Sequence, residues 1–528
     1  MSARPTIHDP SASNPSPEES AGSTFEAALR AYRTGDMVLS RKMADMALVR
    51  DSGDVRWRLL LARLCHESGD RSLALSHLEA VLARDSRQAD AWLQLGVVLD
   101  SDGQTEQAIA RLRQAQAVLP THIGVLNNLG VLLAKAGRNA EGRDILKLAL
   151  SVEPRSHLTH FNLARLLKEG GYLEDALMHY RRAAELKPDL ADAHHNLGNL
   201  LLDLDRAAEA MESFRMATRL RFGIGATGHR NPRLFSKTTS VKLRHDIEQF
   251  HYLRRLGILG ATFEATIADY QDAWSALGNE AGMVNIPAGF RSRLASTYNR
   301  LLHWDPGERI QGPAVNPNLD HATIVADYRR QVPGMAWFDG FLTPEALAAL
   351  RHFCLTSTIW TEFRYSNGYL GSFIDGGFCA PLLHQIASEL AAAFPEIFGG
   401  HPLAKLWAFK YDSKLSGIPI HADFAAVNVN FWLTPDDANQ HPSGGGLKIW
   451  DREAPPEWDF SDYNMNEPAI RQFLGTSGAR MVNVPHRQNR AVMFNSDLFH
   501  ETGDLNFRDG YENRRINVTM LFGRRANA

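Results

Sequence analysis

The chain has 528 residues, which is too long for a single hydrophobic core and predicts several domains. Hydrophobic residues make up 44%, charged residues 22%, and the formal net charge is −3, so the composition indicates neither a nucleic-acid-binding protein nor one bound to acidic membranes. Its three cysteines are far apart and lack CxxC spacing, which argues against a disulfide framework and a cysteine-built zinc site and favours a reducing cytoplasm.

Residues 1–22 are rich in proline and serine and contain no apolar segment typical of a signal peptide. This composition predicts a disordered tail. No later stretch reaches the ~18 uninterrupted apolar residues of a membrane helix, so we expect no membrane partner.

A repeat of 34 residues follows, within a predicted domain of residues 23–222. Helical apolar stripes alternate with breaks at glycine, and each unit therefore predicts a helical hairpin. We count five registers over residues 55–224 and a less regular one before them. These residues resemble tetratricopeptide repeats, and the positions that carry the resemblance are Trp92, Leu95, Gly96, Ala108, Ala115 and Pro120, with Pro154 and Pro188 at the same register.

An amide recurs at the same spacing, directly before a Leu-Gly or Leu-Ala pair: Gln94, Asn128, Asn162 and Asn196. An amide side chain carries both a donor and an acceptor, so a column of amides on the inner face of a solenoid is suited to the backbone of an extended peptide. The repeat arm of O-linked N-acetylglucosamine transferases has a similar ladder. Asn128, Asn162 and Asn196 are therefore candidate substrate-binding residues, and simple tolerance of asparagine in a repeat is the alternative.

Residues 223–334 lack the 34-residue signature and predict a helical connector, with helices over 240–259 and 290–304. His303 and Asp305 form an H-x-D tripeptide there, between a helical pattern and a turn. One such tripeptide is expected by chance, so the surrounding structure must decide which H-x-D carries chemistry.

The pattern changes at residue 335, where the last predicted domain, 335–528, begins. An apolar strand is followed by a helix with Thr343 at its N-cap and Pro344 at its first position. The remaining β-rich runs are separated by turns rather than helices, which favours an antiparallel barrel or sandwich: 406–411, 426–433, 446–450, 490–495 and 515–522.

His421 and Asp423 lie one residue apart on an extended segment, so both side chains point to the same face. His500 follows an apolar run later in the chain and is the candidate third ligand. Two imidazoles and one carboxylate form the facial triad of non-haem Fe(II) enzymes, although zinc hydrolysis is also compatible with them. Arg515, which shares a strand face with Thr519, offers a guanidinium for a dicarboxylate cosubstrate.

As a set, these positions resemble the Fe(II)/2-oxoglutarate dioxygenases of the prolyl-hydroxylase type, over roughly residues 335–528. The resemblance implies a double-stranded β-helix, or jelly roll, after the α-solenoid. It implies that His421, Asp423 and His500 hold Fe(II) and act in catalysis. It also implies 2-oxoglutarate as cosubstrate, with ascorbate as a further candidate cofactor. The residues that would bind 2-oxoglutarate are Arg515, Tyr411 and Thr519, with Arg514 as the alternative to Arg515.

The resemblance implies hydroxylation, because related halogenases lack the carboxylate that Asp423 provides. Aspartyl/asparaginyl β-hydroxylases also join such repeats to an oxygenase but typically lack this carboxylate, and collagen prolyl 3-hydroxylases share both features loosely. We expect a peptide or protein substrate recruited by the repeats. Two alternatives are a small-molecule hydroxylase whose repeats serve oligomerisation or localisation, and a non-catalytic scaffold with a degenerate β-helix.

Two further segments are candidates for substrate contacts. Asn428, Asn430 and Trp432 alternate along one strand and are candidates for the pocket wall, with Asn430 and Trp432 as the candidate substrate-binding residues. Residues 451–488 form a long stretch between predicted strands, where loops usually carry binding functions. Its aromatic residues are suited either to clamping a substrate or to anchoring the loop: Trp458, Phe460 and Tyr463.

Overall fold

A computed structural model describes residues 17–226, 233–278, 282–330, 334–364, 368–412 and 417–525. The chain divides into two compact units, Met1–Leu186 and Lys187–Ala528, each of which is described by itself. The predicted tail of residues 1–22 lies largely outside the described residues, and the first helix begins at Pro17. No helix among the described residues is long and apolar enough to cross a membrane.

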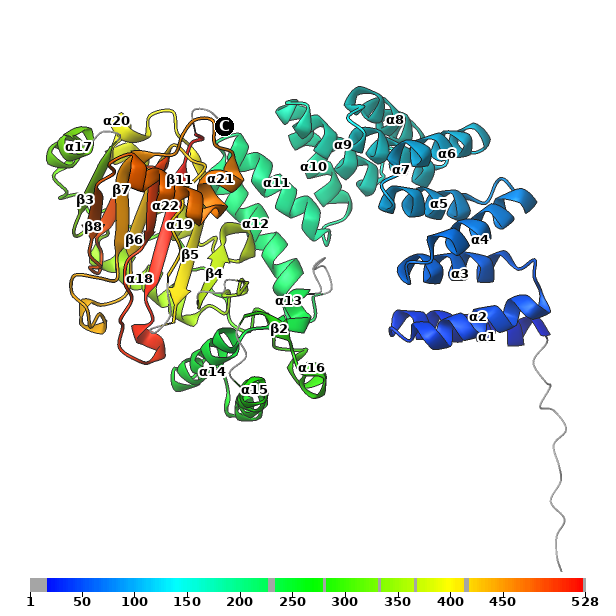
Figure 1. The fold of residues 1–528 in the computed structure, drawn as a ribbon, viewed down its shortest axis with the longest axis horizontal. Helices are drawn as coiled ribbons and strands as arrows, with labels where there is room; N and C mark the ends of the chain where they lie inside the picture. Colours follow the sequence, from blue (N-terminus) through cyan, green and yellow to red (C-terminus); the bar gives the residue numbers. More distant parts are fainter. Residues whose placement is uncertain are drawn as a thin grey trace, which may run out of the picture. The chain divides into compact units, whose positions relative to one another are not determined.

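The first unit consists of antiparallel helical hairpins (Figure 1). Within each hairpin of this unit, a glycine with positive φ lies in the connecting turn, for example Gly103 at 75° and Gly137 at 78°. Only glycine adopts this conformation without strain, which explains its recurrence. The helices are α1 (Pro17–Arg33), α2 (Met37–Arg50), α3 (Val55–Glu67), α4 (Arg71–Arg84), α5 (Ala89–Ser101), α6 (Thr105–Val118), α7 (Ile123–Lys135), α8 (Asn139–Val152), α9 (His157–Glu169) and α10 (Leu173–Leu186).

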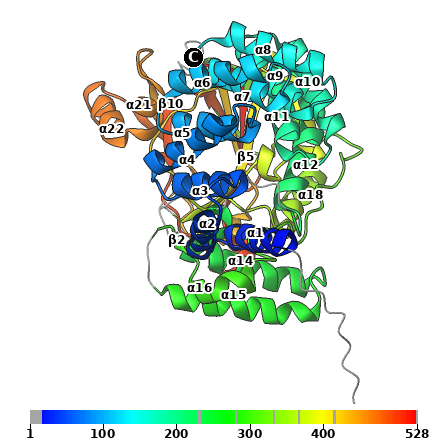
Figure 2. The ribbon, with the colours of Figure 1, turned by 90° about the vertical axis from the view of Figure 1, so that its right-hand side faces the viewer.

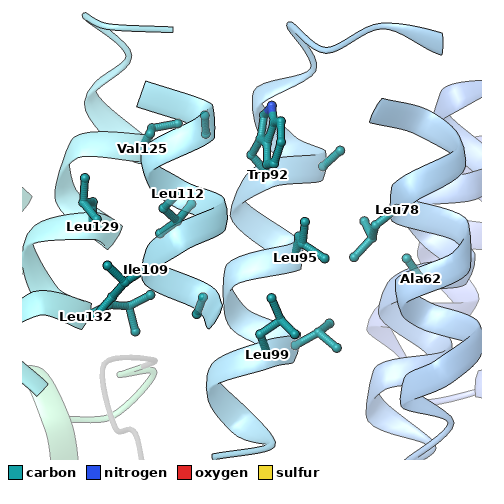
Figure 3. Packing of buried hydrophobic residues seen from close by; sticks show 14 of the residues in the cluster. Ala62, Leu78, Trp92, Leu95, Leu99, Ile109, Leu112, Val125, Leu129 and Leu132 are labelled. Atoms are coloured by element: carbon teal, nitrogen blue, oxygen red, sulfur yellow. The ribbon is translucent and has the colours of Figure 1, made fainter. Parts of the chain in front are cut away.

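The core of this unit is built from the signature positions of the repeat. Trp92, Leu95 and Leu99 on α5 are buried between the neighbouring helices, and Figure 3 shows them facing Leu78 on one side and Leu112 on the other. Each repeat therefore buries its apolar face only against adjacent repeats. The predicted solenoid of helical hairpins is confirmed.

The second unit begins with the last repeat hairpin and continues through shorter helices. Figures 1 and 2 show α14, α15 and α16 grouped at one end of it. The helices are α11 (Ala191–Asp203), α12 (Ala207–Phe222), α13 (Arg233–Ser236), α14 (Ser240–Arg255), α15 (Glu264–Leu277), α16 (Ala288–Leu294), α17 (His321–Arg330), α18 (Pro344–Thr356), α19 (Pro381–Ala393), α20 (Pro395–Phe398), α21 (Phe460–Met465) and α22 (Glu467–Thr476), with short 3-10 turns η1 (Ala261–Phe263), η2 (Ile374–Gly376), η3 (Asp436–Ala438) and η4 (Tyr511–Asn513).

Two antiparallel sheets form the body of the second unit. A six-stranded sheet has the order β3-β9-β6-β11-β5-β4, and a three-stranded sheet has the order β10-β7-β8. A separate small pair is formed by β1 (Lys237–Thr238) and β2 (Val284–Asn285). The other strands are β3 (Met335–Phe338), β4 (Tyr369–Phe373), β5 (Leu403–Tyr411), β6 (Val427–Trp432), β7 (Leu447–Glu453), β8 (Met481–Val484), β9 (Ala491–Asn495), β10 (Leu498–Thr502) and β11 (Ile516–Phe522).

These sheets confirm the antiparallel β architecture predicted from the sequence. All five predicted β-rich runs are strands, and Thr343 caps α18 by accepting a hydrogen bond from the backbone N–H of Ala346. Every β6 residue is buried, because this strand lies inside the six-stranded sheet between β9 and β11.

Two element predictions were wrong. The helix expected over 290–304 ends at Leu294, and Asn299 then has a φ of 52°, which a continuing helix does not permit. The long stretch 451–488 is not an irregular loop, since it holds the end of β7, both α21 and α22, and strand β8.

Helix α14, predicted as part of a spacer, packs into the second unit. Its Lys242 Nζ lies 2.6 Å from both carboxylate oxygens of Asp246, and both side chains are buried. Gln249 donates to the backbone carbonyls of Leu355 and Ser357, at 3.3 and 2.9 Å. The helix is therefore part of the core of this unit.

Candidate metal centre

His421, Asp423 and His500 bring three potential metal ligands together. Their ligand atoms lie within 4.8 Å of one another, and among the described residues they are the group suited to a metal ion. His421 Nε2 is 3.9 Å from Asp423 Oδ1, and His500 Nε2 is 3.5 Å from Asp423 Oδ2. His303 and Asp305, the competing tripeptide, are not part of such a group.

The backbone explains this convergence. His421 lies just before β6 in an extended segment and pairs with His500 on β10 through two backbone hydrogen bonds, of 3.0 and 2.8 Å. Such a pair places two opposed side chains close together, and the imidazole ring centroids are 4.3 Å apart. Asp423, two residues later, shares the face of His421.

Both imidazoles are oriented by hydrogen bonds to the backbone. His421 Nδ1 lies 2.8 Å from the carbonyl oxygen of Pro419, and His500 Nδ1 lies 3.0 Å from that of Leu498. A carbonyl only accepts, so Nδ1 carries a hydrogen on each ring, and in the neutral form of the ring Nε2 presents its lone pair. This arrangement is typical of histidines that bind a metal.

The site is largely removed from water, which shifts the acid–base behaviour of its members. Burial raises the pKa of Asp423, although the neighbouring His421 and a hydrogen bond from Asn428 favour the charged carboxylate. Burial also lowers the pKa of His500 well below its ordinary value, so this ring stays neutral at physiological pH. A cation held between the three side chains would compensate the buried carboxylate.

One cavity joins the three ligands to a buried arginine. Its wall includes Arg515, Tyr411, Asn517 and Thr519 in addition to the ligand residues. Arg515 Nε donates to the carbonyl oxygen of Gly445 at 2.5 Å and Nη2 to that of Gly446 at 3.3 Å.

The remaining nitrogen of this guanidinium, Arg515 Nη1, is buried without a hydrogen-bond partner. The Arg515 side chain is 1% exposed, and its guanidinium carbon lies 4.6 Å from the centre of the Tyr411 ring. Burying a cation with an unpaired donor is costly, and an anion in the cavity would satisfy it.

Arg514, the alternative candidate for binding 2-oxoglutarate, forms ion pairs outside the cavity. Its Nε lies 2.7 Å from Glu248 Oε2 on α14, and its Nη1 lies 3.5 Å from Asp412 Oδ2. Strand alternation turns Arg514 away from the cavity. The side chain does not face solvent, however, because α14 covers it, and it is 3% exposed.

The candidates on β6 have different surroundings. Asn430 lines the cavity, but its Oδ1 accepts from both Asn517 and Thr519 at 2.8 Å. Trp432 is fully buried in an apolar cluster with Met335 and other core residues. Thr519 therefore already uses its hydroxyl hydrogen, and Trp432 has no exposed surface for a ligand.

The 451–488 insert packs on the ligand-bearing segments. Tyr463 is buried in a cluster with Ile420, Ala422 and Phe499, and Trp458 packs against the same cluster. Phe460 remains half exposed. Tyr463 and Trp458 therefore anchor the insert to the rest of the domain, which is one of the two roles expected from the sequence; the other was clamping a substrate.

The amides of the repeat ladder are half-buried and differ in their contacts. Asn162 Nδ2 on α9 donates to Asn127 Oδ1 at 3.3 Å, and Asn196 Nδ2 on α11 donates to its own helix at the carbonyl oxygen of Asp192, at 2.8 Å. Asn128, also half-buried, lies on α7. Gln94 Oε1 on α5 is buried without a partner and lines a cavity with residues of α1 and α3.

Several cavity residues were not identified from the sequence: Trp407, Phe409, Ile418 and Thr502. Trp407 and Phe409 alternate with Tyr411 on β5, so the strand period of two could have predicted that they share the cavity face of Tyr411. Thr502 follows His500 by two residues, and its hydroxyl lies 3.5 Å from that of Tyr411.

Comparison with family models confirms the nature of the helical hairpins. Residues 66–122 and 191–222 match models described as tetratricopeptide repeat, and residues 164–205 match one described as TPR repeat. Such repeats generally bind peptides or proteins. Comparison with curated proteins gives no match.

Solved structures similar to this chain include PilF of Pseudomonas aeruginosa, with 21% identity over 38% of this chain and 92% of that chain, and a TM-score of 0.33. A thermophilic tetratricopeptide-repeat protein of Thermus thermophilus is 24% identical over 34% of this chain and 98% of its own, with a TM-score of 0.30. YrrB, a TPR protein with an unusual peptide-binding site, is 21% identical over 33% of this chain and 90% of its own, with a TM-score of 0.27.

Proposed function

We propose that this protein is an Fe(II)- and 2-oxoglutarate-dependent hydroxylase that acts on a peptide or protein bound by its tetratricopeptide repeats. The observation that carries the proposal is the single cavity shared by the His-Asp-His group and the buried Arg515 with its unpartnered Nη1. A metal hydrolase needs only the three ligands, whereas a buried guanidinium in the same cavity is suited to the carboxylate of a dicarboxylate cosubstrate.

The side chains fit the two groups that the proposal requires. Two imidazoles and one carboxylate are the donor set preferred by non-haem Fe(II), and they leave coordination positions open. Arg515 suits the far carboxylate of 2-oxoglutarate, because a guanidinium binds a carboxylate in a planar, charge-assisted pair. When bound, iron and 2-oxoglutarate supply the dioxygen chemistry that hydroxylates a C–H bond.

Each residue has a separate task in this proposal. His421, Asp423 and His500 hold the metal, and Arg515 and Tyr411 bind the cosubstrate. Thr519 reaches the carboxylate only by releasing Asn430, its present acceptor. The two antiparallel sheets support the double-stranded β-helix that such enzymes use.

The repeats support a peptide or protein substrate, because solenoids of this kind present extended binding surfaces. In this proposal Asn128, Asn162 and Asn196 grip the substrate backbone. Asn430 lines the pocket with its Oδ1 already accepting from Asn517 and Thr519. Trp432 supports the pocket from within the sheet, because it is buried with its ring centre 5.8 Å from the Arg515 guanidinium carbon.

The proposal is tested by trapping the substrate. The Asp423→Ala variant, with the repeats intact, is used to capture proteins that the wild type modifies. Each captured protein is then incubated with wild type, Fe(II) and 2-oxoglutarate, and mass spectrometry should find one added oxygen atom on a defined residue. If no captured protein gains oxygen while succinate still forms, the substrate is a small molecule.

A further inference from the structure

A continuous chain of buried amides leads away from the candidate metal ligand Asp423. Asn428 Nδ2 donates to Asp423 Oδ2 at 2.6 Å, and Asn430 Nδ2 donates to Asn428 Oδ1 at 2.6 Å. Asn517 Nδ2 and Thr519 Oγ1 on β11 then both donate to Asn430 Oδ1 at 2.8 Å. The chain crosses from the ligand segment through β6 to the strand that follows Arg515.

The carboxylate fixes the direction of every hydrogen bond in this chain. Asp423, when ionised, only accepts, so Asn428 must turn its NH₂ group toward it and its oxygen toward Asn430. Asn428 in turn accepts through its oxygen, so Asn430 must turn its NH₂ group toward Asn428. The oxygen of Asn430 then accepts from Asn517 and Thr519 on β11. No member can rotate its amide without breaking a buried hydrogen bond.

The chain is shielded from solvent. Exposure is 6% for Asp423, 0% for Asn428, 4% for Asn430 and 3% for Asn517. Backbone pairing holds the strands in register, with Asn430 opposite Thr519. Without water to compete, these hydrogen bonds hold the Asp423 carboxylate in one rotamer.

We propose that Asn428 and Asn430 are positioning residues: they form an amide relay that orients Asp423 for metal binding and ties it to the strand of Arg515. This inference rests on the proposed metal site. Asn428 lies next to the ligand, not in a position to bind the metal, because its NH₂ group faces Asp423. Partners of this kind typically change metal affinity 10- to 100-fold when removed.

The test is calorimetric titration of the metal-free full-length protein with Mn²⁺, together with the absorption spectrum of its Co²⁺ form. Asn428→Ala should weaken Mn²⁺ binding about 10-fold or more and alter the Co²⁺ bands, because the carboxylate gains rotational freedom. Asn430→Ala should have a smaller effect in the same direction, since it acts through Asn428.

Val429→Ala is the matched control, because Val429 lies between the two asparagines, is fully buried and points to the other side of β6. It should lower the unfolding temperature and leave both metal readouts unchanged. Wild-type Mn²⁺ affinity in the Asn428→Ala protein, or an equal loss in Val429→Ala, would overturn the relay. Failure of the wild type to bind Mn²⁺ would instead overturn the metal site itself.

Discussion

At the scale of single residues, two adjacent arginines differ in what they face. Each has an Nη1 without a hydrogen-bond partner, but Arg515 lines the cavity, whereas Arg514 forms ion pairs with Glu248 and Asp412. Arg515→Ala should raise the 2-oxoglutarate concentration needed for half-maximal succinate formation roughly 30-fold or more, since truncating a buried charge pair costs on the order of 2 to 5 kcal/mol.

Arg514→Ala is the control for this prediction. It should leave the 2-oxoglutarate requirement near that of the wild type but lower the free energy of unfolding by on the order of 3 kcal/mol, because a buried ion pair is broken. Equal effects of the two substitutions on the 2-oxoglutarate requirement would mean that the β11 register is misassigned.

The buried His486 should make the free energy of unfolding depend on pH. Burial lowers its pKa to about 3, helped by the positive charge of Arg515, and its Nε2 pairs with the carbonyl oxygen of Thr434 at 3.1 Å. The folded state keeps the ring neutral, whereas the unfolded chain takes up a proton below about pH 6.5. Its contribution to stability is therefore complete above pH 6.5 and is lost as the pH falls toward 3.

At pH 5.5 this loss amounts to about 1.4 kcal/mol for one histidine. Denaturant unfolding of wild type and His486→Gln at pH 7.5 and 5.5 measures it, because glutamine cannot take up a proton. The difference in unfolding free energy between the two pH values should be smaller for the variant by about this amount. An identical pH dependence would show that His486 is charged in the folded protein.

At the scale of elements, the insert between β7 and β8 is hydrogen-bonded to the segment that carries two of the three candidate ligands. The backbone N–H of Ala422, between His421 and Asp423, donates to the carbonyl oxygen of Tyr463 at 2.8 Å, and Asn464 Nδ2 donates to the Ala422 carbonyl oxygen at 2.9 Å. Helix α21 therefore binds both backbone groups of the residue between two ligands.

Asn464→Ala should loosen this segment without unfolding the domain. Losing one hydrogen bond costs about 1 kcal/mol, which corresponds to roughly fivefold faster amide hydrogen exchange in residues 418–426. Met465→Ala serves as the control, because this neighbouring side chain is 74% exposed. Unchanged exchange in the Asn464 variant would show that the sheet alone holds the segment.

The sequence predicted elements well where a single periodicity dominated. The 34-residue repeat and the five β-rich runs are local signals, since helical and strand faces follow from residue spacing. The insert was missed because α21 and α22 are short and their apolar residues are anchored on Ile420 and Phe499, which are distant in sequence. The hydrogen bonds of Asn430 and the burial of Arg514 could not be predicted either. They depend on β11 and α14, which are distant in sequence from the residues they contact.

At the scale of the whole molecule, the repeats and the metal site should be separable in function. A triple variant of Asn128, Asn162 and Asn196 to alanine should keep the slow 2-oxoglutarate turnover expected without substrate but lose hydroxylation of a protein substrate at subsaturating concentration. Each neutral hydrogen bond is worth about 0.5 to 1.5 kcal/mol, so three together should weaken binding roughly tenfold or more.

The control for this variant replaces exposed residues of the second helices in the repeats, Gln114, Lys147 and Met178, by alanine. These positions lie on α6, α8 and α10, outside the amide ladder. Circular dichroism verifies that both triple variants remain helical. Unchanged hydroxylation by the folded ladder variant would show that the amide ladder does not recognise the substrate.

The central claim, that the second unit is a 2-oxoglutarate-dependent oxygenase, is tested most directly by measuring succinate. Purified wild type with Fe(II), dioxygen and 2-oxoglutarate should produce succinate, at least slowly without substrate. His421→Ala and Asp423→Ala should abolish this production, because each removes one of three metal ligands. Succinate formation at the wild-type rate in both variants, or its absence in the iron-loaded wild type supplied with its captured substrate, would contradict the account.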